Sequence, residues 1–344
     1  MNVISKYNIS KDEVLNSFNF LKKSDVVYAA SVPTDEFYSN FNTTSNEIVY
    51  QQNDHTLFKS TKFKIKNNDI VFCNTFFIKQ LFNHLNSDTK LKNITLITHQ
   101  ADLSITKSLY RLKPKCISKW YGINIEHKDR NLIPIPLGIA NTKNEKNLVY
   151  EDFYNFNNPN AVKKDKIYCS FNVNTNYFHR VKILKIINNT DFVKGFNLDL
   201  EGYIKNLHTY KFTLCPWGNG LDSHRFWESL YSNSIPITKN HSYYQSFKEI
   251  NKLLIDDYSS INLLNRDRLN LDMNYEVLTI SWWIKLMKKN EIQQDNEYVH
   301  FHENELINTK NKKKYYAQIR LINRKKILST LIRKIHKKIF NINF

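Results

Sequence analysis

The stretch YKFTLCPWGNGLDSHRFWESLYSNSIPI (residues 210–237) predicts a strand, a loop, a helix and a second strand, in that order. Residues 212–215 form a short apolar run that suits a buried strand, and residues 224–231 suit a helix. The next apolar run begins at residue 235. Two strands joined by a helix are typical of a parallel sheet, in which ligands bind at the carboxyl ends of the strands.

The same alternation of strand and helix signals occupies the rest of the chain. The predicted strands are residues 25–30, 69–73, 94–98, 116–121, 132–136, 167–171 and 253–255; the predicted helices are residues 76–85, 180–187 and 203–208. Residues 31–36 are predicted as a loop, and the polar, Asn-rich residues 150–165 as a linker. We therefore expect an α/β protein of two Rossmann-like domains that face a cleft.

The positive charge of the chain is concentrated at one end. The 344 residues include 50 Lys and Arg against 32 Asp and Glu, which gives a net charge of +18. Residues 309–344 contain 12 basic residues and no acidic one, so the other 308 residues carry only +6. This distribution predicts an ordinary pair of domains with a basic tail, rather than a nucleic-acid-binding body.

Cysteine usage and hydropathy indicate the compartment. The four cysteines form no CxxC pair and lie in apolar stretches, which predicts buried free thiols: Cys73, Cys116, Cys169 and Cys215. The N-terminus lacks the apolar core of a signal peptide, and no run reaches the roughly 18 apolar residues of a membrane span. We therefore expect a protein of a reducing compartment, the cytoplasm.

The loop within residues 210–237 carries the most informative chemistry. Gly218 and Gly220 are two of only six glycines in the chain. The helix that follows directs free N–H groups and a positive dipole end toward the loop, and Arg225 lies in its first turn. Glu228 lies three residues further on, on the same helix face as Arg225. An arginine and a glutamate so placed suit the diphosphate and the ribose of a nucleotide.

A plainer interpretation of this loop remains open. The glycines can form an ordinary turn, and Arg225 and Glu228 a surface ion pair, with Asp222 or Ser223 capping the helix. No Walker motif or G-x-G-x-x-G pattern occurs, so P-loop and dinucleotide sites are not predicted.

The pattern in residues 212–230, with residues 235–237, resembles the signature of exostosin-like glycosyltransferases of surface-glycan synthesis. Two weaker matches lie upstream, at residues 118–138 and residues 171–180, in the expected order. The resemblance implies a two-domain, GT-B-type fold, a nucleotide-sugar donor and inversion of the anomeric centre. It implies an acceptor domain at residues 1–155 and a donor domain at residues 156–308, which the basic tail at residues 309–344 would follow.

The resemblance also implies roles for particular residues. Arg225 would contact the donor diphosphate, Glu228 the ribose, and Arg180 a second phosphate oxygen. Trp217 and Trp227 are interpreted as packing residues. The remaining donor-loop contacts would be Gly218, Asn219, Gly220, Asp222 and His224.

An inverting transfer needs a base that accepts the proton of the acceptor hydroxyl. We expect it in the first domain, at the carboxyl end of a strand. Asp102 is the first candidate and His99 the second; Asp35 and Glu36 follow another strand. Each has a structural alternative, because the carboxylates can cap helices and His99 can be a buried structural histidine.

No cofactor and no metal ion is expected. His300, His302 and Glu303 are the nearest approach to a ligand set, but they are interpreted as helix residues without a further ligand at a familiar spacing. Asp199 is interpreted as the cap of the helix near residue 203, not as part of an Asp-x-Asp metal motif.

The basic tail completes the prediction. Its apolar residues repeat at helical spacing, at Leu328, Leu331, Ile332, Ile335 and Ile339, with lysines and arginines between them. Such a helix suits an anionic membrane surface, although it can also pack on the protein. We therefore expect a cytoplasmic enzyme, peripheral on a membrane, that transfers a sugar to a glycan or lipid-linked acceptor and binds no nucleic acid. The alternatives are a related transferase with another activated donor, such as a CMP-linked sugar acid, and a non-catalytic basic protein that binds membranes or nucleic acid.

Overall fold

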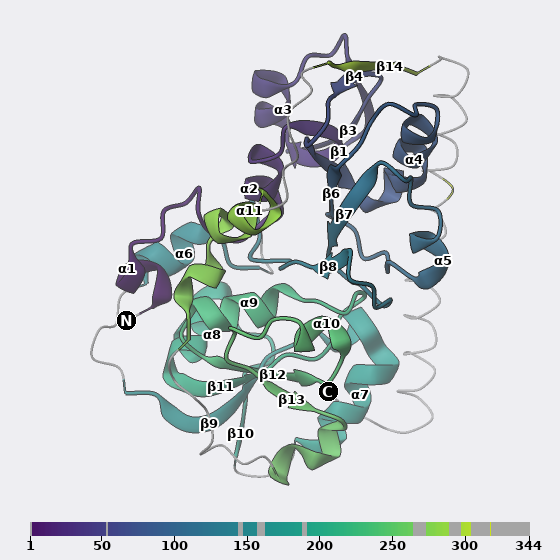
Figure 1. Ribbon diagram of the computed structural model, residues 1–344. Helices are drawn as coiled ribbons and strands as arrows, with labels where there is room; N and C mark the ends of the chain where they lie inside the picture. Colours follow the sequence, from purple (N-terminus) through teal and green to yellow (C-terminus); the bar gives the residue numbers. More distant parts are fainter. Residues whose placement is uncertain are drawn as a thin grey trace.

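The protein is a mixed α/β structure built on two main sheets (Figure 1). The computed structural model describes residues 2–52, 54–143, 147–156, 162–187, 191–263, 273–288, 297–303 and 317. The predicted tail at residues 309–344 therefore lies outside the described residues, apart from Ala317. The first sheet occupies the upper part of Figure 1 and the second the lower part.

The first sheet has seven strands in the order β2-β3-β1-β5-β6-β7-β8. Its parallel strands are β1 (Val26–Pro33), β5 (Ile70–Asn74), β6 (Ile94–His99), β7 (Ile117–Gly122) and β8 (Leu132–Pro134). β2 (Asn46–Gln52) and β3 (His55–Ser60) are antiparallel to their neighbours. The helices of this part are α2 (Ser17–Lys22), α3 (Thr34–Asn40), α4 (Ile78–Asn86) and α5 (Lys107–Tyr110), with the 3-10 turn η1 (Thr75–Phe77). The central strands β5 and β6 are buried along their whole length, as expected for strands covered on both faces.

The second sheet has five strands, all parallel, in the order β10-β9-β11-β12-β13. The strands are β9 (Lys164–Cys169), β10 (Phe192–Lys194), β11 (Tyr210–Leu214), β12 (Ile235–Lys239) and β13 (Leu253–Ile255). The helices are α7 (Tyr177–Ile186), α8 (Leu200–Thr209), α9 (His224–Tyr231) and α10 (Ser242–Gln245), with η2 (Val173–Asn176) and η3 (Tyr258–Leu263). The predicted strand, helix and strand of residues 210–237 are therefore confirmed as β11, α9 and β12.

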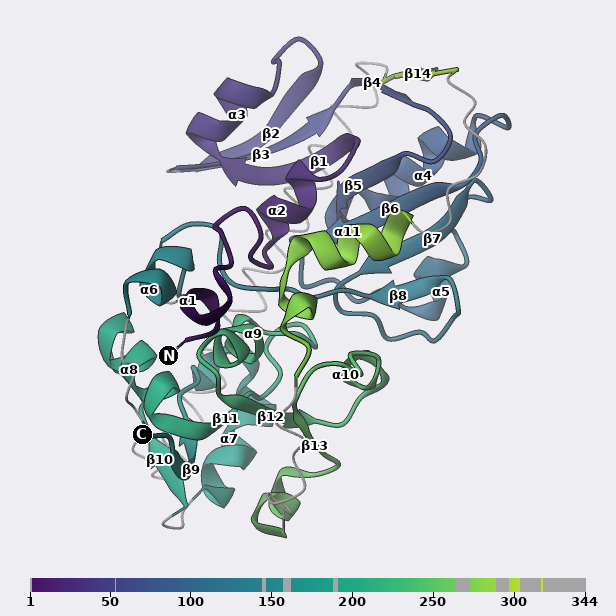
Figure 2. The same ribbon diagram turned by 60° about the vertical axis from the view of Figure 1, so that its left-hand side comes forward.

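The last described segments return to the N-terminal half. α11 (Ile280–Lys288) follows η4 (Tyr275–Leu278), and the N–H group of Ile280 donates to the carbonyl of Glu13 at 2.8 Å. Both views show α11 beside α2 (Figures 1 and 2). β14 (Val299–His302) then pairs with β4 (Lys62–Ile65) in a separate two-stranded sheet. The two predicted domain boundaries, at residues 155 and 308, stay predictions.

A continuous cluster of buried apolar side chains joins the two sheets. It includes Leu96 on β6, Trp227 on α9 and Tyr168 on β9. A smaller cluster, which includes Ile167 and Phe212, covers the other face of the second sheet. The four cysteines are buried and free, as predicted. Among the described residues, no helix combines the length and the apolar character that crossing a bilayer requires.

Three expectations about local structure are wrong. Residues 31–36 are not a loop, because β1 continues to Pro33 and α3 begins at Thr34. Asp35 and Glu36 lie in the first turn of α3, where carboxylates interact well with the helix dipole. The predicted linker at residues 150–165 contains α6 (Tyr150–Asn155) and the start of β9. The first sheet is not purely parallel, because the hairpin of β2 and β3 extends it.

We predict that the Lys59–Glu303 ion pair holds β14 on the first sheet. Both side chains are only 1% exposed, and Glu47 adds a second carboxylate at 3.8 Å from Lys59 Nζ. Glu303→Ala should lower the free energy of unfolding by about 3 kcal/mol, because it leaves a buried ammonium group poorly paired. Urea denaturation measures this change.

A matched control is Lys90→Ala, which removes an exposed ion pair at 3.8 Å and should change stability by less than about 0.5 kcal/mol. The double variant Lys59→Met, Glu303→Leu should recover most of the loss, because it removes both members of the buried pair together. Equal effects of Glu303→Ala and Lys90→Ala would show that the buried pair does not hold the strand.

Candidate functional site

The loop between β11 and α9 is fixed against the first half of the chain. A β-carbon on Gly220 would lie only 2.6 Å from Oδ1 of Asn124, so a larger residue would collide there. Gly218 is less restricted, because a β-carbon there would meet its nearest neighbours, on Arg180 and Thr175, at 3.6 Å. Gly220 therefore serves the close approach of the loop to the segment that follows β7.

Arg180 shapes this loop from α7. Its Nε donates to the carbonyl of Trp217 at 2.9 Å, Nη1 to Asn172 at 2.6 Å and Nη2 to Pro216 at 3.0 Å. The side chain is buried, and within the described part of the chain no carboxylate lies within ion-pair distance of it. Burial and the neighbouring Arg225 lower the pKa of Arg180 to about 9, so it still carries a charge at neutral pH.

Arg225 is the second guanidinium of this region. It lies in the first turn of α9, and its Cζ is 5.6 Å from the centre of the Tyr203 ring. Its Nε is buried without a hydrogen-bond partner, and the described residues include no ion-pair partner for it. A buried arginine and a half-buried one without a carboxylate partner among the described residues are costly, so this region favours binding of an anion.

Glu228 lies one turn beyond Arg225 and is buried. Its Oε2 accepts a hydrogen bond from the hydroxyl of Tyr203 at 2.7 Å, and its Oε1 accepts one from the N–H of Leu148 at 3.1 Å. The structure therefore brings Arg225 and Glu228 to one region, as predicted from their spacing, but not into an ion pair within 4 Å. A ribose contact by Glu228 stays a prediction.

Asp222 is the most heavily hydrogen-bonded group of the loop. It is buried, and its carboxylate lies among donors from both halves of the chain. The N–H of Leu137, Nε1 of Trp227 and the hydroxyl of Tyr243 lie 3.0, 2.8 and 2.9 Å from Oδ2. The N–H of Ser223 and the hydroxyl of Tyr244 lie 2.8 and 3.3 Å from Oδ1.

Two other predicted donor contacts have different surroundings. Nδ1 of His224 donates to the carbonyl of Gly138 at 2.7 Å and so ties α9 to the first half. Asn219 is exposed at the tip of the loop. Trp227 is fully buried, as its interpretation as a packing residue implies, whereas Trp217 is only half-buried.

His99 is buried at the end of β6. Its Nδ1 accepts a hydrogen bond from the N–H of Gln100 at 2.8 Å, so the ring proton lies on Nε2, which donates to the carbonyl of Pro136 at 3.1 Å. Burial lowers the pKa of His99 to about 3. The imidazole is therefore neutral at physiological pH, and both of its nitrogens are hydrogen-bonded within the protein.

The three predicted carboxylate bases lie in different places. Asp102 is exposed and follows Ala101, whose carbonyl accepts a hydrogen bond from Nδ2 of Asn124 at 3.3 Å. It does not cap α5, whose N-cap is Thr106. Asp35 and Glu36 lie on α3, far from α9 in both views (Figures 1 and 2). Of the three, Asp102 is therefore the carboxylate that lies next in sequence to a contact of Asn124, the residue that touches the glycine loop.

Two residues of the site escaped the sequence analysis. Asn124 contacts Gly220, and its Oδ1 accepts the N–H of Asp222 at 3.0 Å. Its positive φ of 55° is typical of Asn in tight turns, but the sequence alone does not locate it. Tyr203 lies inside a predicted helix, where no local signal marks it as a partner of Glu228.

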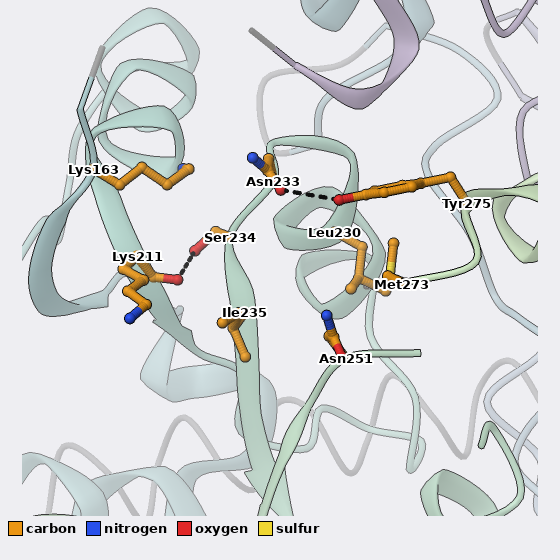
Figure 3. A pocket seen from close by; sticks show the side chains of 9 residues that line it. All are labelled: Lys163, Lys211, Leu230, Asn233, Ser234, Ile235, Asn251, Met273 and Tyr275. Carbon is orange, nitrogen blue, oxygen red and sulfur yellow. Dashed lines mark hydrogen bonds between the residues drawn. The ribbon is translucent and has the colours of Figure 1, made fainter. Parts of the chain in front are cut away.

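A separate cavity of about 310 Å³ lies at the amino-terminal ends of β11 and β12 (Figure 3). Its lining includes Lys163, whose Nζ donates to the carbonyls of Leu207 at 2.9 Å and His208 at 3.0 Å. Asn233 and Tyr275 are hydrogen-bonded across another part of it. This cavity lies at the opposite strand ends from the glycine loop, so it is not part of the candidate site.

No group of three or more His, Cys, Asp or Glu side chains within the described ranges is placed to hold a metal ion. His300 and His302 lie on the strand β14, not on a helix as expected, and Glu303 pairs with Lys59. Asp199 caps α8, as interpreted from the sequence, and its Oδ1 accepts the N–H of Gly202 at 2.8 Å.

Comparison with known proteins gives likeness to distant solved structures. No protein-family model and no curated protein sequence matches the chain. A solved structure described as the crystal structure of alpha1,3-fucosyltransferase is 14% identical, with a TM-score of 0.29. The match covers 65% of this chain and 78% of that one. A TM-score of this size does not establish a shared fold.

The burial of His99 predicts a loss of stability in acid. Below about pH 6.5 the unfolded chain takes up a proton on this histidine, whereas the folded protein does so only near pH 3. Between these limits wild type should lose up to about 1.4 kcal/mol per pH unit more than His99→Gln. Denaturant unfolding between pH 4 and 8 measures the two slopes.

Above pH 7 the two proteins should have the same pH dependence, because His99 is then unprotonated in both states. Equal slopes at pH 4–6 would show that the folded protein protonates His99 as readily as the unfolded chain does.

Proposed function

We propose that the protein is a glycosyltransferase that uses a nucleotide-sugar donor. One observation carries the proposal: a buried guanidinium, on Arg180, and a second with a buried and unpartnered Nε, on Arg225, lie beside the glycine loop at the carboxyl end of β11. This is the edge of a parallel sheet at which ligands bind. The pattern of residues 212–230 and its resemblance to exostosin-like enzymes support the choice of a sugar donor.

The donor diphosphate would bind at the start of α9. Arg225 keeps a buried Nε without a partner, and a helix N-terminus adds a positive dipole end. Arg180 uses three of its five N–H donors on backbone carbonyls, so it would contribute mainly its charge. Around them, the exposed Asn219 and the backbone of Gly218 are the proposed further contacts. These groups would stabilise the negative charge that develops on the leaving diphosphate.

The proposed transfer proceeds with inversion and without a metal ion. A base in the first half then accepts the proton of the acceptor hydroxyl as the glycosidic bond to the diphosphate breaks. Asp102 is the proposed base, because it is exposed and directly follows Ala101, whose carbonyl binds Asn124, the residue that contacts the glycine loop. His99 has both nitrogens hydrogen-bonded, which favours a structural role.

The proposed acceptor is a glycan or a lipid-linked glycan at a membrane. The support is the composition of residues 309–344, with 12 basic residues and no acidic one. An anionic membrane surface attracts such a segment by on the order of 1 kcal/mol for each basic residue near it. We propose a cytoplasmic enzyme, peripheral on the membrane, with no nucleic-acid partner.

The donor proposal predicts that nucleoside diphosphates bind and that Arg225 is needed. In a thermal-shift screen of UDP-, GDP-, dTDP- and CMP-sugars, one donor class should raise the unfolding temperature of wild type by mass action. Arg225→Ala should weaken that binding by roughly 10- to 100-fold, because it removes charge-assisted hydrogen bonds. Transfer from the identified donor should persist in a chelator.

Arg130→Ala is the matched control, because it removes an exposed arginine of the first half. It should leave donor binding unchanged. Full transfer activity in Arg225→Ala would contradict the proposed site, and loss of activity in chelator with recovery in manganese would contradict metal independence.

The membrane proposal predicts that vesicle binding can be lost separately from donor binding. Deletion of residues 309–344 should release the protein from vesicles that contain anionic phospholipid, while donor binding remains. Raising the salt concentration should weaken binding of the intact protein, since the attraction is electrostatic. Sedimentation with vesicles of 30% phosphatidylserine measures both effects, and unchanged sedimentation of the deleted protein would exclude the tail as the anchor.

A further inference from the structure

We infer that Glu228 and Tyr203 are positioning residues that hold the guanidinium of Arg225 in place for an incoming anion. The inference rests on the proposed donor site at Arg225. It differs from a ribose contact, because Glu228 would act through Tyr203 and would not touch the substrate.

The contacts form a chain from the guanidinium to the connection between the sheets. The guanidinium lies 5.6 Å from the centre of the Tyr203 ring. The hydroxyl of Tyr203 donates to Oε2 of Glu228, and Oε1 of Glu228 accepts the N–H of Leu148. The carboxylate is thus bound on both oxygens, and the ring cannot turn without breaking a buried hydrogen bond.

Arg225 needs this support more than Arg180 does. All three donor nitrogens of Arg180 reach backbone carbonyls, which fixes that side chain directly. Nε of Arg225 has no hydrogen-bond partner, so the contact with the Tyr203 ring is its main constraint. A cation–π contact is worth only on the order of 1 kcal/mol at partly exposed sites. Because the hydrogen bond to Glu228 fixes the ring of Tyr203, this weak contact holds the guanidinium in one orientation.

The surrounding charges also keep Arg225 ionised. Burial disfavours the charged form of Arg225, but the ring of Tyr203 and the carboxylate of Glu228 outweigh it and raise the pKa of Arg225. Burial, followed by the Glu228 charge, raises the pKa of Tyr203 well above its usual value, so the phenol stays neutral and remains a donor. The arrangement therefore keeps a full positive charge on Arg225 and a proton on Tyr203.

The role of Glu228 can be tested by whether Glu228→Gln raises or lowers the affinity for an anion. A carboxylate near Arg225 repels an anion, so on charge alone Glu228→Gln should strengthen anion binding. If Glu228 positions Arg225, the same substitution should weaken binding, because Gln cannot accept from Tyr203 and Leu148 with equivalent oxygens. A ribose contact would weaken binding of a nucleoside diphosphate while leaving that of pyrophosphate unchanged.

The experiment is calorimetric titration of the full chain with inorganic pyrophosphate and with UDP. Glu228→Gln and Tyr203→Phe should each weaken binding of both ligands by about tenfold. Tyr231→Phe is the matched control, because Tyr231 is a buried tyrosine at the other end of α9 whose hydroxyl bonds Leu15 and Leu278. It should lower the unfolding temperature without changing either affinity.

Several outcomes would overturn the inference. Tighter binding of both ligands to Glu228→Gln would show that only charge matters, and weaker binding of UDP alone would show a ribose contact. Unchanged binding in both variants, with binding lost in Arg225→Ala, would reject the positioning role and leave the donor site standing. Wild type that binds neither ligand would reject both. If Glu228→Gln does not fold, the affinities of Tyr203→Phe test the inference, since this variant removes only the hydroxyl and keeps both the aromatic ring and the carboxylate of Glu228.

Discussion

The carboxylate of Asp222 fixes the relation between the glycine loop and the first sheet. It is buried, where an ionised carboxylate is costly, and donors from several segments offset that cost. Burial still raises the pKa of Asp222, which shows how strongly the site is desolvated. Because Leu137 follows β8 and Trp227 lies on α9, one side chain joins the β8 edge of the first sheet to α9. The contact of Gly220 with Asn124 depends on this fixed geometry.

The two arginines beside this loop have different roles, one structural and one proposed for binding. Arg180 uses its nitrogens on three backbone carbonyls, and so it gives the loop its shape. Arg225 rests on an aromatic ring and retains an unpartnered Nε. A guanidinium with three of its five N–H groups bound to backbone carbonyls has fewer donors left for a phosphate than one that is supported on its face. The binding capacity of the region therefore lies with Arg225.

The sequence predicts what depends on local pattern and misses what depends on distant partners. α9 spans residues 224–231 as predicted, because its apolar spacing lies within one stretch. The sequence does not predict the hairpin of β2 and β3. Lys59 on β3 has the character of a surface residue, and its burial depends on Glu303, which lies 244 residues further along the chain. Likewise, Arg225 follows from its motif, but the partners of Glu228 are 25 and 80 residues away.

Net charge is a poor guide to where this protein binds an anion. Outside the tail the chain carries only +6, spread over 308 residues. Exposed lysines contribute little locally, since water and salt screen them over about 10 Å. Arg180 is buried and the Nε of Arg225 is enclosed, so their fields act through a medium of lower effective dielectric constant. Two such cations attract a diphosphate more strongly than a larger number of solvated ones, so a body of low net charge can still offer the proposed anion site.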